Sequence, residues 1–149
     1  MKHSGPLVFS FLLGLAAVIT LACGSSHPIV PNCGAAATSA NMTGVPQSVS
    51  VCPAAADAQS YPGGQVQFVA TGYFAVPPTP VTPLPAFWGA CSQNAPTTAV
   101  SISSTGLAHC AAGSSGTYSV FAAESTNCNA ITACGGGCQV SGYAKLTCP

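Results

Sequence analysis

Nine cysteines in a chain of 149 residues constrain the fold of this protein more than any other feature of the sequence. Such a number indicates a disulfide framework in an exported protein and a metal or redox centre in a cytosolic one. The N-terminus favours export. Lys2 and His3 precede an apolar stretch over residues 7–22, which is shorter than the roughly 20 residues of a membrane span but long enough for a secretory signal. We therefore expect an exported chain with disulfides.

Nine is an odd number, so at least one cysteine has another role. The residues Thr20-Leu-Ala-Cys23, followed by Gly24 and two serines, resemble a bacterial lipoprotein signal. The resemblance implies that residues 1–22 are a signal peptide, that Cys23 is lipidated, and that the mature chain is anchored to a membrane of the cell envelope. In a cell with two membranes, Gly24 implies the outer membrane. Ordinary cleavage with secretion and an uncleaved anchor are the alternatives.

Lipidation of Cys23 leaves an even number of cysteines, and we expect these to form four disulfides. They are Cys33, Cys52, Cys91, Cys110, Cys128, Cys134, Cys138 and Cys148. Cys91 and Cys110 flank a predicted strand over residues 99–103, and we expect them to pair.

Short runs of alternating apolar and polar residues predict an all-β domain over residues 47–149, behind a tether over residues 23–46 that is rich in Ala, Gly, Ser and Pro. The runs cover residues 48–51, 65–70, 99–103, 117–122 and 143–147. Residues 117–123 and 142–148 form a predicted final hairpin with a cysteine-rich loop between its strands. The predicted core residues are Phe68, Trp88, Tyr118, Val120 and Leu146, with Trp88 at the centre. We also expect the Tyr118 hydroxyl to bond to nearby backbone.

Residues 48–53 and 63–73, followed by Trp88 and the runs 99–103, 106–107 and 116–122, resemble bacterial immunoglobulin-like domains of group 2 in type and order. The resemblance implies an antiparallel immunoglobulin-like β-sandwich, stapled here by disulfides. It also implies a non-catalytic structural or adhesive role at the cell envelope.

Charge is nearly absent, with two Lys or Arg residues and two Asp or Glu residues in the whole chain. A nucleic-acid partner is therefore not expected, because such proteins need a basic surface. Catalysis is not expected either, because Asp57, Glu124, His27 and His109 are too few to assemble a proton-transfer site. We expect no cofactor, and both acids on the solvated surface.

Three binding hypotheses remain beside the structural one. Exposed aromatic side chains at Tyr73, Phe74 or Tyr143 could stack on carbohydrate. The proline-rich residues 76–85 could dock into a partner's aromatic groove, or form a simple extended crossing between strands. Cys128, Cys134 and Cys138, with His109, could form a metal or redox site, although their spacing favours disulfides and we expect no metal.

Overall fold

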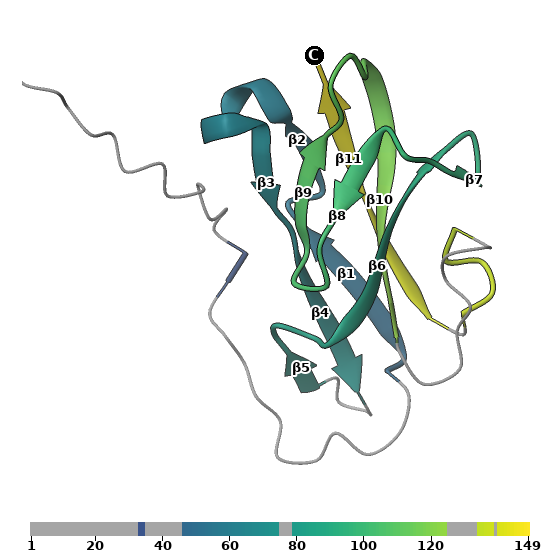
Figure 1. Cartoon of the computed structure of the whole chain (residues 1–149). Coiled ribbons are helices and arrows are strands. Elements are labelled where there is room, and N and C mark those ends of the chain that lie inside the picture. The colour runs from purple at the N-terminus through teal and green to yellow at the C-terminus, as the bar shows by residue number, and fades with distance from the viewer. Residues whose placement is uncertain (1–32, 35–45, 75–78, 125–133, 139) are drawn as a thin grey trace, which may run out of the picture.

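The computed structural model describes residues 33–34, 46–74, 79–124, 134–138 and 140–149. These residues are mostly β-strand (Figure 1), and the expectation of an all-β, mainly antiparallel chain is confirmed. Helical structure in this part of the chain is restricted to two short 3-10 turns, η1 (Ala58–Ser60) and η2 (Pro62–Gly64). None of the described segments is a helix long and apolar enough to cross a membrane. The predicted signal peptide, Cys23 and most of the tether lie outside the described residues.

Strands and short turns alternate through the described part of the domain. The strands are β1 (Ser48–Cys52), β2 (Ala55–Asp57), β3 (Gln65–Gln67), β4 (Val69–Phe74), β5 (Thr79–Val81), β6 (Ala86–Ser92), β7 (Ala95–Pro96), β8 (Val100–Ile102), β9 (Leu107–Cys110), β10 (Gly116–Glu124) and β11 (Ser141–Cys148).

Three hydrogen-bonded sheets result, with strand orders β1-β4-β5, β3-β9-β8 and β2-β11-β10-β6-β7. The first two sheets are connected along the chain, because Phe68 alone separates β3 from β4. The backbone N–H of Phe68 donates to the carbonyl of Gly106, 2.9 Å away, so contact with the β8–β9 turn continues across this break. Gly106 has a φ of 84°, and a side chain there would collide with the Phe68 carbonyl and the Trp88 ring. Glycine is therefore required where the two segments approach.

One hydrophobic cluster, which we call the inner core, contains residues from all three sheets. Its fully buried members include Phe68, Val120 and Leu146, which confirms these three core predictions. The predicted alternation also holds on the strands that supply them. Val66 and Ala70 are buried beside Phe68, as are Ala122 beside Val120 and Ala144 beside Leu146. Period-two patterning therefore identified the inward-facing side of these strands correctly.

Trp88 was predicted at the centre of the core, but it is half-buried and packs against the inner core, whereas Phe68 and Leu146 are fully buried within it. Among the described strands, β10 borders β6 at Trp88, and β7 pairs with β6 at Cys91 and Ser92 alone, so the other side of Trp88 has no strand beside it. Tyr118 is also half-buried beside the inner core, and its hydroxyl donates to the Ser115 carbonyl at 3.0 Å, as expected.

The predicted final hairpin is confirmed, since β10 and β11 pair antiparallel from Gly116↔Cys148 to Ala123↔Ser141. A second small cluster, the outer cluster, lies on the opposite face of this sheet and comprises Cys91, Phe121, Ala123 and Cys134. The sequence places Phe121 on the solvent side of its strand, yet it is 2% exposed. It is buried because β10 has a strand on either side and the segment around Cys134 covers its outer face.

The pairing of β2 departs from the predicted antiparallel arrangement. The three-residue strand β2 pairs parallel to β11, with Ala55 opposite Lys145 and Asp57 opposite Thr147. The residues of β2, Ala-Ala-Asp, do not alternate between apolar and polar, so the sequence gave no indication of a strand there.

Candidate functional site

Disulfides connect three pairs of the predicted cysteines: Cys33–Cys52, Cys91–Cys134 and Cys110–Cys148. Cys138 is also disulfide-bonded, while Cys23 and Cys128 lie outside the described residues. The predicted Cys91–Cys110 pair is wrong. Cys91 belongs to the outer cluster, whereas Cys110 packs against the inner core on the opposite face of the five-stranded sheet, where Cys148 lies. The prediction relied on the two cysteines flanking one strand in the sequence, and that position does not indicate which sheet face each sulfur occupies.

The bridges remove two of the four residues that the metal and redox hypotheses proposed, Cys134 and Cys138. Cys134 is bonded to Cys91 and Cys138 is disulfide-bonded, so neither sulfur is a thiolate that could hold zinc. Cys134 and Cys138 do not bond to each other across the three glycines, as a redox pair would. No group of three His, Cys, Asp or Glu residues capable of holding a metal occurs within the described ranges.

The three aromatic residues considered for stacking differ in exposure. Phe74 is 5% exposed and belongs to the inner core, so its assignment as an exposed aromatic is wrong; it lies on the inward side of β4. Tyr73 is half-buried. Tyr143 is 52% exposed, and with Phe87 it is one of two large apolar side chains exposed in the described part of the chain.

The two acids also differ from each other. Asp57 is exposed, as expected, and its carboxylate accepts a hydrogen bond from the Gln59 backbone N–H at the start of η1. Glu124 is 8% exposed, so the prediction of a solvated position is wrong for this residue. It ends β10, where Ala86 of β6 is its ladder partner and its backbone N–H donates to Val140. The neighbours on both sides bury it.

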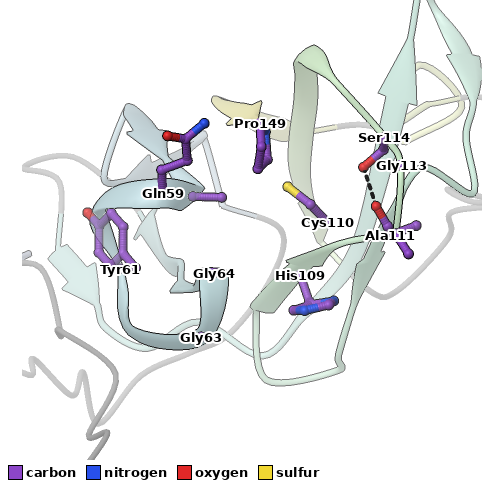
Figure 2. Close-up of a pocket in the computed structure, with 12 residues that line it drawn as sticks. Gln59, Tyr61, Gly63, Gly64, His109, Cys110, Ala111, Gly113, Ser114 and Pro149 are labelled. Carbon is purple, nitrogen blue, oxygen red and sulfur yellow. Dashed lines mark hydrogen bonds between the residues drawn. The ribbon is translucent and has the colours of Figure 1, made fainter.

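A hollow of about 570 Å³ lies at the end of the domain where η1, η2, the turn after β9 and the C-terminal residue meet. In Figure 2, Tyr61 and Cys110 are on opposite sides of it. Its lining contains the imidazole of exposed His109 but no acidic side chain, and Ser114 Oγ donates to the Ala111 carbonyl at 2.7 Å. This arrangement presents one imidazole together with backbone and hydroxyl groups, and no Asp or Glu side chain of the lining is placed to orient that imidazole.

A second hollow of about 390 Å³ lies beside Trp88 and includes Pro83, Leu84 and Pro85 in its lining. These prolines belong to the proline-rich run that was considered as a docking motif. Residues 76–78 of the run lie outside the described residues, while Thr79–Val81 forms β5 against β4. The described part of the run is therefore an edge strand and its connection to β6, which agrees with the simpler of the two interpretations.

A third hollow of about 270 Å³ lies on the outer face of the five-stranded sheet, next to the Cys91–Cys134 bridge. Side chains of ladder partners point to the same face of a sheet, which places Ser119 beside Lys145 and Thr117 beside Thr147. We call this surface the outer shelf. It consists of Thr117, Ser119, Tyr143, Lys145 and the turn residues Gln93 and Asn94.

Tyr143 is held in place although half of it is exposed. Its hydroxyl lies 3.3 Å from the Cys134 carbonyl, to which it donates, and its ring lies against Phe121 with 6.4 Å between centroids. Gly135 makes this approach possible: its φ is 82°, and a Cβ there would lie 2.9 Å from the Tyr143 hydroxyl. The Cys91–Cys134 bridge fixes the corner to β6. A covalent bond and a glycine thus fix an exposed aromatic ring.

Lys145 carries the one ammonium group among the described residues. It is exposed on the outer shelf and forms no ion pair within the described ranges. Sequence reasoning found Tyr143 but missed Lys145, Gln93 and Asn94 as members of the same surface. The alternation of β11 already placed Tyr143 and Lys145 on one face, but nothing in the sequence indicated that the β6–β7 turn lies beside them.

Comparison with known proteins adds no assignment, because no family model matches the chain and no curated protein matches it.

Proposed function

We propose that this chain is an exported, lipid-anchored protein of the cell envelope with one non-catalytic immunoglobulin-like domain that has a structural or adhesive role. The observation that supports it most strongly is the combination of the disulfides with the strand order. Three described bridges suggest an oxidising environment outside the cytoplasm.

The strand order supports an immunoglobulin-like domain. In such a sandwich, the first, second, fifth and fourth strands form one sheet, and the third, sixth and seventh form the other. If β3 and β4 count as one strand and the short β2, β5 and β7 as additions, the chain follows the order β1-β4-β9-β8 on one side. On the other side it follows β6-β10-β11. The bond from Tyr118 to Ser115, at the start of the sixth strand, matches the tyrosine corner of that fold.

The Cys33–Cys52 bridge supports a short anchor. Cys33 lies ten positions after Cys23, and the bridge joins it to the end of β1. A fully extended segment of that length spans about 35 Å, so a lipid on Cys23 would hold the domain close to the membrane surface. A short reach suits a protein that contributes to the envelope or its adhesion better than one that extends far from the cell.

Fractionation of cells that express Cys23→Ser tests the anchor. We expect the unchanged protein in the membrane fraction and the variant in the soluble or secreted fraction, with Cys33→Ser as a matched control that loses a different cysteine and stays with the membrane. Persistence of Cys23→Ser in the membrane fraction would contradict the proposal. Intact-mass measurement of the native protein should show lipid and four disulfides, and an experimental structure would test the strand order.

A further inference from the structure

The outer shelf has the features of a carbohydrate site rather than those of a protein interface. Its aromatic residue, Tyr143, is fixed at both the hydroxyl and the ring, so binding would restrict it little further. Hydroxyls and amides surround this ring, and such groups can hydrogen-bond to sugar hydroxyls. The hollow of about 270 Å³ is smaller than the roughly 300–1,000 Å³ of enclosed small-molecule sites. It suits one ring of a longer chain lying across the surface.

The charge on the shelf selects among sugars. Lys145 lies on β11, the strand that also carries Tyr143, and projects beside Ser119 of β10. The nearest described acid along this ladder is Asp57, which lies opposite Thr147 on the neighbouring β2 and caps η1. Asp57 lies on the same face of the sheet as Lys145, and its carboxylate already accepts the Gln59 backbone N–H. A cation beside an exposed aromatic ring matches a sugar that presents a carboxylate next to its apolar ring face.

We propose that the outer shelf binds an acidic polysaccharide, with the Tyr143 ring stacking on a sugar ring and the Lys145 ammonium pairing with its carboxylate. Gln93, Asn94, Thr117 and Ser119 supply hydrogen bonds at the margins. The inference rests on the proposed adhesive role, because it identifies what the domain would adhere to. A protein partner is not favoured, since a stable protein interface buries about 800 Å² on each side around an apolar centre, and Tyr143 is the shelf's one large exposed apolar side chain.

Binding to polygalacturonate, alginate and hyaluronate tests the proposal, measured by titration calorimetry on the full-length protein at low ionic strength. Fully methyl-esterified polygalacturonate is the matched control ligand, because it keeps the sugar chain and removes the charge. We expect Tyr143→Ala to weaken binding by about tenfold, the size of effect typical of a stacking contact. We expect Lys145→Gln to weaken binding to the acidic chains by about two- to fivefold and to leave the weaker binding to the ester unchanged. Added salt should reduce the Lys145 effect.

Phe87→Ala is the matched control variant, since Phe87 is 43% exposed but lies outside the shelf, and it should bind like the unchanged protein. Thermal melts establish that each variant is folded. Any of three results overturns the proposal: no binding to the three acidic chains, equal loss in Phe87→Ala and Tyr143→Ala, or equal affinity for acid and ester. The Cys23→Ser protein separates this proposal from the anchor, because released protein should bind the same polysaccharide with unchanged affinity.

Discussion

The inner core and the outer cluster lie on opposite faces of the same sheet and are closed in different ways. The inner core draws on all three sheets, and strand pairing surrounds it. The outer cluster has four buried residues, two of which are the partners of a disulfide, and a short segment covers it. The difference shows what the disulfide contributes. The outer cluster buries too little apolar surface to fix the segment around Cys134 by packing alone, and the Cys91–Cys134 bond fixes it.

The sharpest test of this difference compares one phenylalanine from each cluster. Phe68→Ala should lower the free energy of unfolding by about 3–5 kcal/mol, because the fully buried ring leaves a cavity that three sheets cannot close. Phe121→Ala should cost clearly less, because the covering segment can collapse into the space. Urea unfolding of both variants measures the two values. An equal loss would mean that the outer cluster is as rigidly packed as the inner core.

Removing the Cys91–Cys134 disulfide tests what closes the outer cluster. The double variant Cys91→Ala, Cys134→Ala should lose about 2–4 kcal/mol of stability, since the bridge closes a loop with a sequence separation of 43 residues. Far-UV circular dichroism should be unchanged, while hydrogen exchange at Phe121 and Ala123 should accelerate. Unchanged protection there would show that packing, not the bridge, closes the cluster. Removing Cys110–Cys148, which links two sheets, is the contrasting control and should loosen the inner core.

The glycine beneath Tyr143 offers a smaller perturbation. Gly135→Ala places a side chain at a φ of 82° and against the Tyr143 hydroxyl, so we expect a loss of about 1–2 kcal/mol. Gly113→Ala is a close match in backbone strain, with a φ of 77°, but its Cβ would meet open space. Thermal melts of both variants separate strain from collision. If Gly135 makes room for the Tyr143 hydroxyl, Gly135→Ala must be the more destabilised of the two variants.

The smallest expected effect concerns the corner before β10. Tyr118→Phe removes the hydroxyl that donates to the Ser115 carbonyl and should cost about 0.5–1.5 kcal/mol, the usual contribution of one hydrogen bond. Tyr61→Phe is the control, because the Tyr61 hydroxyl has no hydrogen bond within the described chain. Chemical denaturation measures both. If Tyr118→Phe is as stable as Tyr61→Phe, the hydrogen bond from Tyr118 to Ser115 does not stabilise the fold.

Local pattern predicted strands where apolar and polar residues alternate, from the short run before Cys52 to the longer runs of β10 and β11. The inward positions of β10 and β11 followed from the sequence, because each strand is long enough to display its period. The same reasoning failed for β2, whose residues do not alternate, and for Phe121, whose burial depends on a segment remote in sequence. The candidate site follows this division. Tyr143 was visible as an aromatic on a strand, whereas its fixed hydroxyl depends on Cys134 and Gly135.

The sequence by itself determined an all-β, disulfide-rich domain, because alternation, turn residues and cysteine number are local or compositional properties. The tertiary structure decided which cysteines pair, since that depends on which strands become neighbours, and chain order leaves those neighbours open. It also decided that Trp88 packs against the inner core while half-buried and that Glu124 is buried, because the burial of a side chain depends on the elements packed around it. The outer shelf exists for the same reason: hairpin pairing and one distant bridge bring its residues together.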